Sequence, residues 1–155
     1  MFLVTWSNKM NQVRIRDMDL GDVAEVYSLG SQESKFCVVE EEEGFWRRDI
    51  LENWVNSYDD VSIIAESGGD LVGFFLATYH PVTRKGTLEN AFVKPGYRER
   101  GIAARMYEEV EKRLIEKNAA YICGFVETKN QTSLGLIEKF GFLRDKEYHW
   151  MIKFL

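Results

Sequence analysis

The sequence predicts a mixed α/β domain in which helices cover both faces of one sheet. Segments with strand and helix periodicity alternate in the order β-α-α-β-β-β-α-β-α-β-β. The dipeptide Gly68-Gly69 separates two apolar runs, which is typical of a tight hairpin between strands. A further apolar strand at 87–93 leads through a short basic turn into a long amphipathic helix. These observations predict one mixed sheet with helices packed against both of its faces.

Hydrophobic periodicity locates the elements of the first half of the chain at residues 13–16 (strand), 20–29 and 45–56 (helices), and 61–66 and 71–79 (strands). Asp17 or Asp19 is expected to cap the first helix, because a short acidic side chain accepts hydrogen bonds from free backbone amides. In the second helix, apolar residues from Trp46 to Trp54 recur at helical spacing and are expected to form one face.

The second half is expected to contain elements at residues 87–93 (strand), 102–117 (helix), 120–127 (strand), 132–140 (helix), and 142–144 and 148–154 (strands). Gly141 is a natural C-terminal cap for the helix before it. We expect one domain at 12–155, preceded by an N-terminal extension at 1–11. Trp6 in this extension offers a contact for a homodimer.

Composition narrows the class of protein. The formal net charge is -5, which argues against nucleic acid as the main partner. No apolar run is long enough to cross a bilayer, so no membrane contact and a cytoplasmic location are expected. Cys37 and Cys123 do not form a disulfide framework, and Cys123 is expected to be a small core residue. His80 and His149 lack partners at metal-ligand spacing, so no metal is predicted.

The turn at 94–101 predicts an anion site. A strand that feeds a glycine-containing turn leaves unpaired N–H groups at the start of the next helix, near the positive end of its dipole. Arg98, Arg100 and Arg105 add positive charge there, in an acidic chain. Such a site suits a phosphate or pyrophosphate. An ordinary strand–helix junction with solvated arginines is the alternative.

The spacing Arg98-x-x-Gly101-x-Ala103 resembles the acyl-CoA signature of the GNAT superfamily of N-acetyltransferases, Arg/Gln-x-x-Gly-x-Gly/Ala. Residues 130–142 resemble the family's later Asn-x-x-Ser/Ala…Glu-Lys-x-Gly-Phe segment, and the similarity in layout covers about residues 12–155. The resemblance implies the family fold, a mixed and mostly antiparallel sheet flanked by helices. It also implies transfer of an acetyl group from acetyl-CoA to a primary amine, by direct attack in a ternary complex.

By this resemblance, the amides from Arg98 to Ala103 cradle the CoA pyrophosphate, and Gly101 allows its close approach. The strand edge at Val93 is expected to splay from the next strand near 125–126, so that pantetheine pairs with it and an N–H near Val93 polarises the thioester. Asn130 either bonds to pantetheine or caps a helix. The residues expected at the cofactor are Phe92, Val93, Arg98, Glu99, Arg100, Gly101, Ile102, Ala103, Asn130 and Ser133.

Glu89 is the candidate catalytic residue. Strand alternation places it on the same side as Ala91 and Val93. A carboxylate in an otherwise apolar strand is costly to bury, and service as a general base is one reason for its presence. The run 88–93 also resembles the polyamine-type branch of the family, where this glutamate is the base. A half-exposed strand residue in a salt bridge is the alternative.

Protonation of the leaving thiolate departs from the family pattern. Many members have a tyrosine directly before the Glu-Lys of the later segment, whereas Ile137 stands here. The thiolate then leaves without a dedicated acid, or another tyrosine (Tyr79, Tyr121 or Tyr148) supplies the proton. A third possibility is a non-catalytic acyl-CoA-binding regulatory module.

In the family, the acceptor pocket is built from the first two helices and their loop, here about 28–45, and from the stretch 79–87. Carboxylates and aromatic rings in that loop favour a cationic amine, either a small amine such as a polyamine or a peptide amine. For the acidic run, a solvated loop is the alternative. The residues concerned are Glu33, Glu40 to Glu43, Phe36, Phe45 and Trp46.

Overall fold

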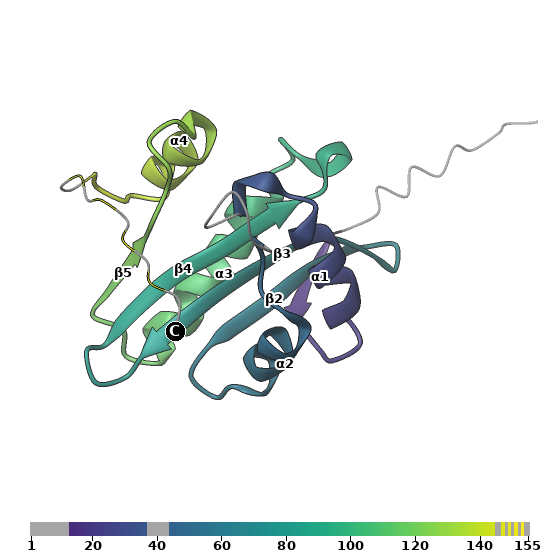
Figure 1. Ribbon diagram of the computed structural model, residues 1–155, viewed down its shortest axis with the longest axis horizontal. Helices are drawn as coiled ribbons and strands as arrows, with labels where there is room; N and C mark the ends of the chain where they lie inside the picture. The colour runs from purple at the N-terminus through teal and green to yellow at the C-terminus, as the bar shows by residue number, and fades with distance from the viewer. Residues whose placement is uncertain are drawn as a thin grey trace, which may run out of the picture. The chain divides into compact units, whose positions relative to one another are not determined.

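The computed structural model describes residues 13–36 and 44–144, together with residues 147, 149, 151 and 153 (Figure 1). Contacts divide the chain into two compact units, Met1–Gly124 and Phe125–Leu155, and each is described by itself. The predicted extension at 1–11 lies outside the described residues. The single domain predicted for 12–155 stays a prediction.

One sheet forms the centre of the first unit, with its strands in the order β1-β2-β3-β4-β5. They span β1 (Arg14–Asp17), β2 (Val61–Ser67), β3 (Asp70–His80), β4 (Lys85–Val93) and β5 (Tyr121–Gly124). Pairing is antiparallel from β1 to β4 and parallel between β4 and β5. Gly68 and Gly69 join β2 to β3 with φ values of 63° and 92°, which confirms the predicted hairpin.

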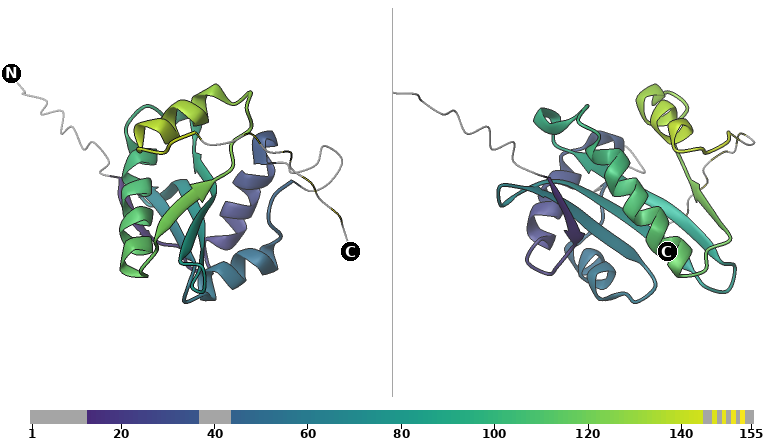
Figure 2. Two further views of the ribbon diagram at one scale, coloured as in Figure 1. Left: turned by 90° about the vertical axis from the view of Figure 1, so that its left-hand side faces the viewer. Right: turned by 180° about the vertical axis from the view of Figure 1, so that it is seen from behind.

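Helices cover both faces of this sheet, as predicted. They are α1 (Val23–Ser31), α2 (Arg48–Asn56) and α3 (Ile102–Glu116), with short 3₁₀ turns η1 (Ser34–Phe36) and η2 (Pro95–Tyr97). Phe74 is fully buried in a cluster with residues of α1 and α2. Its neighbour Gly73 faces α3, where an added Cβ would come within 3.3 Å of Met106 Cε. α3 accordingly crosses the opposite face, where it contacts β2, β3 and β4 (Figure 2).

A β-bulge interrupts the pairing of β3 with β4. Leu76 pairs with Asn90, whereas the next residue, Ala77, pairs with Leu88. Glu89 is therefore the extra residue on β4. A bulge breaks the strict alternation of side chains between the two faces. Beyond this point, the position of a residue along β4 no longer predicts the face on which its side chain lies.

β4 has a free edge beyond its partner β5. Their parallel pairing ends at Leu88 and Gly124, while β4 continues to Val93. β5 is correspondingly shorter than the strand predicted at 120–127. The end of β4 up to Val93 is therefore unpaired with β5, and its splay from residues 125–126 stays a prediction.

The start of α1 corrects the prediction of a helix from Leu20. Asp19 Oδ1 accepts a hydrogen bond from Gly21 N at 2.7 Å, and Asp22 N donates to Asp19 O at 3.1 Å. This local turn delays the helix, so that Asp22 becomes its N-cap residue instead of Asp17 or Asp19.

The second unit contains α4 (Gln131–Lys139). Residues 142–144 were predicted as a strand and are not one. The N–H of Phe142 donates to Ile137 O at 3.3 Å and that of Gly141, at φ 88°, to Glu138 O at 3.0 Å. These two bonds cap the C-terminal end of α4, so Phe142 belongs to the helix cap and not to a strand. The strand predicted at 148–154 lies mostly outside the described residues.

Candidate active site

The turn between η2 and α3 presents free backbone amides. Gly101 is the N-cap residue of α3, with φ 74°, and no heavy atom lies within 4 Å of where its Cβ would stand. The first intrahelical bond runs from Arg105 N to Gly101 O at 3.0 Å. The amides of Ile102 and Ala103 therefore have no acceptor within the helix, and the helix dipole makes this end partly positive. The expected anion site is geometrically open.

Arginine side chains around this turn have different partners. The guanidinium of Arg100 lies 5.4 Å from the ring centroid of Tyr97, beside the turn. Arg105 Nη2 instead donates to Val13 O at 2.9 Å, in front of β1. The guanidinium of Arg105 is thus held at β1, while that of Arg100 stays beside the turn. Glu99 is exposed and has φ 61°. Together with Gly101, it is one of two residues near the start of α3 in the left-handed region.

Val93 directs its backbone polar groups toward the free edge of β4. It pairs with Gly73, and Lys94 N donates to Val72 O at 2.8 Å. In an antiparallel ladder this bond marks Val93 and Gly73 as a non-hydrogen-bonded pair. The N–H and C=O of Val93 therefore point away from β3, along the edge that β5 leaves unpaired. An extended group placed there could pair with them.

The side chain of Arg98 lies across this edge. Its Nε donates to Val93 O at 2.8 Å, its Nη2 lies 3.8 Å from Glu33 Oε2, and its guanidinium lies 5.9 Å from the Phe92 ring centroid. Glu33 follows α1, so Arg98 connects the end of that helix with the end of β4. Part of its charge is thus directed at Glu33 rather than at the turn.

Glu89 lies on the face covered by α1 and α2, which corrects its predicted side. Thr78 Oγ1 donates to Glu89 Oε1 at 2.8 Å, and Thr78 shares its face with Leu76. Val93, by contrast, approaches the α3 face beside Gly73. The bulge causes the difference, because it shifts the alternation of β4 by one residue. The described partner of Glu89 is therefore a hydroxyl group rather than a cation.

Asn90 and Trp46 stand beside Glu89 on the same face. Asn90 pairs with Leu76, and Trp46 Nε1 donates to Asn90 Oδ1 at 2.6 Å. The indole of Trp46 lies edge-on to Trp54, with ring centroids 5.3 Å apart. A carboxylate, an amide and a partly exposed indole thus meet on one surface of the first unit.

Trp46 is the most exposed of the aromatic residues predicted near the acceptor. Phe45 is only 8% exposed, and its ring fills the space beside Gly30, where an added Cβ would lie 2.2 Å away. Phe36 stacks on Phe45 with ring centroids 5.6 Å apart. Both rings therefore belong to the core. Glu40 to Glu43 lie outside the described residues.

In the second unit, Asn130 is the N-cap residue of α4. Its Oδ1 accepts a hydrogen bond from Ser133 N at 3.2 Å. This is the capping role that the sequence left as an alternative to a cofactor contact, and the two roles are compatible. Ile137 is half-buried on α4, at the position where many family members have tyrosine.

The tyrosines considered as proton donors lie far from Val93. Tyr79 and Tyr121 pair with the first residues of β4, whereas Val93 is its last residue. At about 3.3 Å per residue, the separation along the strand is roughly 20 Å. Neither tyrosine is therefore placed to protonate a thiolate held at Val93. Tyr148 lies outside the described residues.

Neither His80 nor Cys123 shows the surroundings of a reactive group. Thr83 N donates to His80 Nδ1 at 3.2 Å, which is the contact of a histidine in a turn. Cys123 is half-buried, with its Sγ 3.7 Å from Thr87 Oγ1. In the part of the chain that the structure describes, no group of His, Cys, Asp and Glu is arranged to hold a metal ion. Within the same residues, no helix is long and apolar enough to span a membrane.

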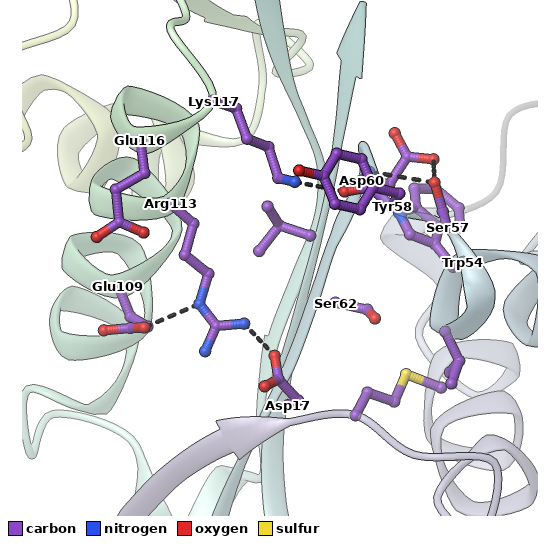
Figure 3. A pocket seen from close by; sticks show the side chains of 13 residues that line it. Asp17, Trp54, Ser57, Tyr58, Asp60, Ser62, Glu109, Arg113, Glu116 and Lys117 are labelled. Carbon is purple, nitrogen blue, oxygen red and sulfur yellow. Dashed lines mark hydrogen bonds and ion pairs between the residues drawn. The ribbon is translucent and has the colours of Figure 1, made fainter.

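A hollow of about 590 Å³ lies elsewhere on the first unit, among α3, β1, β2 and the segment after α2 (Figure 3). Several of its charged side chains pair with one another or with the backbone. Arg113 lies between Glu109 and Asp17, and Lys117 Nζ donates to Tyr58 O. Neither the free edge of β4 nor the turn before α3 lines this hollow. We therefore do not identify it with the active site.

The unpaired edge of β4 and the open start of α3 suit a ligand that has an extended arm and a pyrophosphate. The model of the Acetyltransferase (GNAT) family matches residues 24–142. The chain therefore belongs to the GNAT acetyltransferase family, which confirms the predicted family and enzyme class. A curated acetyltransferase from Pectobacterium atrosepticum is 29% identical over 108 residues, which cover 63% of this chain and 75% of that protein.

Solved structures share the fold at low identity. A PaiA N-acetyltransferase from Thermoplasma acidophilum, solved with coenzyme A, has a TM-score of 0.75 at 20% identity, covering 88% of this chain and 93% of its own. The aminoglycoside N-acetyltransferase AAC(6')-Iy, solved with CoA, has a TM-score of 0.75 at 20% identity (92% and 95%). A transcriptional regulator from Bacillus halodurans has a TM-score of 0.76 at 17% identity (92% and 100%).

Sequence reasoning did not connect Thr78 or Asn90 with the site. Thr78 is a hydroxyl residue within an apolar strand, two residues after Leu76 and therefore on the same face. Asn90 directly follows Glu89 in the sequence. Both signals were present in the sequence. The bulge that brings the two residues beside Glu89 leaves no comparable local pattern.

Proposed function

We propose that this protein is an N-acetyltransferase that moves an acetyl group from acetyl-CoA to a primary amine by direct attack in a ternary complex. One observation carries the proposal. Val93 turns its N–H to an unpaired strand edge, where its C=O accepts a hydrogen bond from Arg98 Nε, and the same chain segment continues into the open start of α3. A single ligand with an extended amide arm and a pyrophosphate would match both features.

Acetyl-CoA is proposed to bind along this segment. The amides from Arg98 to Ala103 would hold its pyrophosphate, and the arm would pair with the edge at Phe92 and Val93. The N–H of Val93 would donate to the thioester oxygen, where negative charge develops during attack. From the second unit, we propose Asn130 and Ser133 as further contacts to the arm.

Glu89 is proposed as the general base. Its carboxylate would take a proton from the acceptor ammonium, directly or through water, and the free amine nitrogen would attack the thioester carbon. A C–N bond forms, the C–S bond breaks, and the sulfur leaves as a thiolate. Because Ile137 cannot donate a proton, we propose that water relays to the thiolate the second proton that the nitrogen loses as it becomes an amide; the low basicity of the thiolate makes it a good leaving group.

The acceptor is proposed to be a cationic primary amine, on a small molecule or a peptide. The acidic run Glu40 to Glu43 would favour positive charge near the acceptor side, whereas the charge of Glu33 is partly offset by Arg98 at 3.8 Å. Structural neighbours include an aminoglycoside N-acetyltransferase and a ribosomal-protein-S18-alanine N-acetyltransferase, which act on amines of both kinds. A cytoplasmic location, a homodimer, and the absence of nucleic-acid and membrane partners stay predictions.

A non-catalytic acyl-CoA-binding regulatory module is the second candidate. Ile137 at the usual tyrosine position favours it, and a transcriptional regulator is among the structural neighbours. Such a module would bind acetyl-CoA without releasing thiol for any amine. Turnover therefore separates the two candidates.

Thiol release from acetyl-CoA across a panel of primary amines tests the proposal. Wild-type protein should release thiol with at least one cationic amine, and Glu89→Gln should lower kcat on the order of 100- to 10,000-fold. The affinity for coenzyme A, measured by calorimetry, should stay unchanged in that variant. Thermal stabilisation by acetyl-CoA without any thiol release would support the regulatory module instead.

A further inference from the structure

Trp46 differs from the other described tryptophan of the first unit in its exposure. Trp54 is 6% exposed and donates its Nε1 to Ala77 O inside the core. Trp46 stands just before α2 and is 36% exposed, although it packs edge-on against Trp54. A large apolar side chain left partly open beside charged groups is a common feature of a binding surface.

Asn90 holds the indole of Trp46 in place. The 2.6 Å bond from Trp46 Nε1 to Asn90 Oδ1 occupies the polar tip of the ring, so that a ligand meets the exposed apolar part of the indole. Asn90 is itself fixed by pairing with Leu76 on β3. A side chain held at both its polar tip and its packed edge loses little further freedom when a ligand binds.

The residues that anchor the indole and the Glu89 carboxylate lie at neighbouring register positions on one face of the sheet. Along β3, Leu76 lies opposite Asn90, and Thr78, two residues further, bonds to Glu89. Two residues of a strand span about 7 Å. This is roughly the length of a short alkyl chain between two amino groups. A ligand amine at Glu89 would thus place a second group over or beside Trp46.

We infer that Trp46 is a specificity-determining residue of the acceptor site, which selects a primary amine that carries a second positive charge. Glu89 receives the reacting ammonium, while the π-face of Trp46 attracts the second cation and covers the methylene groups between them. The inference rests on the proposed function, because it takes the surface beside Glu89 as the acceptor site.

Calorimetric titration of the protein saturated with coenzyme A provides a test without turnover, since this cofactor carries no acetyl group. The probes are diaminopentane and pentylamine, which have equal chain lengths and differ in the second ammonium. Wild-type protein should bind the diamine more tightly. Trp46→Ala should raise the Kd of the diamine about ten-fold and that of the monoamine less than about three-fold.

Two further variants separate recognition from folding. Trp46→Phe keeps an aromatic face and packing against Trp54, so it should raise the diamine Kd only about three-fold. Tyr58→Ala is the matched control, because Tyr58 is 90% exposed and lies outside the candidate site. It should bind both probes as the wild type does. Unchanged affinity for coenzyme A in every variant would show that the fold is intact.

Steady-state kinetics then identify which idea fails. With the diamine as acceptor, Trp46→Ala should raise KM about ten-fold and leave kcat nearly unchanged. Normal diamine affinity in this variant, or an equal loss for diamine and monoamine, would overturn the inference while leaving the proposed function intact. If the wild type releases no thiol with any amine, the proposed function fails. A Trp46-dependent preference for the diamine in the calorimetry would then still support recognition of a dication.

Discussion

The two halves of the candidate site are built in different ways. At the cofactor half, between Val93 and Ala103, the polar groups belong to the backbone of one continuous segment. At the acceptor half, Glu89, Thr78 and Trp46 come from segments far apart in the chain and act through side chains. The first half is therefore a local feature of the sequence, whereas the second exists only when the sheet and α2 have assembled.

The contrast has a consequence for substitutions. A change in the cofactor half acts through backbone conformation and should affect every acceptor alike. A change in the acceptor half removes one contact and should discriminate among acceptors or steps. Measuring both kinds of variant with the same acceptor therefore tests whether the two halves are separable.

Gly101→Val should have the largest effect. Gly101 has φ 74°, and a β-branched residue in that conformation costs on the order of 1–3 kcal/mol, which the turn would relieve by moving. We expect the Kd for acetyl-CoA to rise by about 10- to 100-fold, measured by calorimetry, with the same loss for every acceptor.

Gly96→Ala is the matched control for that variant. Gly96 lies in the same turn, has open space where an added methyl group would stand, and does not have a positive φ. Its substitution should change the Kd for acetyl-CoA by less than about two-fold. An equal loss of affinity for acetyl-CoA in the two variants would show that any substitution in this turn weakens binding, and that the positive φ of Gly101 is not the cause.

Thr78→Val should have an intermediate effect, confined to the acceptor half. It removes the hydroxyl group that holds Glu89 Oε1 at 2.8 Å and keeps the shape of the side chain. We expect kcat to fall about ten-fold, while the KM for acetyl-CoA is unchanged. Thr78→Ser should restore most of the rate, because it returns the hydroxyl group.

Thr87→Val provides the control for Thr78. Thr87 lies directly opposite Thr78 in the register, and its hydroxyl group faces Cys123. This variant should keep kcat within about two-fold of the wild-type value. A loss as large as that of Thr78→Val would mean that sheet packing, and not the contact with Glu89, sets the rate.

Asp22→Asn should have the smallest effect on turnover and act on stability. Asp22 accepts hydrogen bonds from Arg16 at 2.7 and 2.9 Å, and Arg16 Nε donates to Glu66 at 3.1 Å. This network connects β1, α1 and β2. We expect the free energy of unfolding to fall by about 1–2 kcal/mol at neutral pH, measured by denaturant titration, with kcat unchanged.

The pH dependence of that loss follows from the pKa of Asp22. Burial raises the pKa, but the hydrogen bonds from Arg16 and from the Asp19 amide outweigh it and hold the pKa below its ordinary value of 3.8. The stabilisation is therefore complete above about pH 4 and is lost as the pH falls through the lower pKa of the folded state. The wild type and Asp22→Asn should converge in stability in that acidic range. A difference in stability that does not shrink as the pH falls below 3.8 would contradict this assignment.

Much of this protein could be predicted from short-range patterns. The order of elements through α4, the Gly68-Gly69 hairpin and the turn before Gly101 depend on periodicity and on glycine conformation, which neighbouring residues reveal. The backbone conformation of the turn before α3 follows from the same local signals, while its role at the cofactor stays a prediction. The false strand at 142–144 shows the limit, since the same apolar residues serve a helix cap when a glycine precedes them.

The acceptor half required the assembled sheet. The face of Glu89 depends on a bulge that arises from how β3 and β4 align, and strand alternation without it places the carboxylate on the opposite side. The hydrogen bond between Trp46 and Asn90 joins the segment just before α2 to β4. The local sequence around either residue does not specify this contact. Backbone geometry is encoded within a few residues, whereas contacts between distant side chains depend on register and packing, and these emerge only when the whole fold forms.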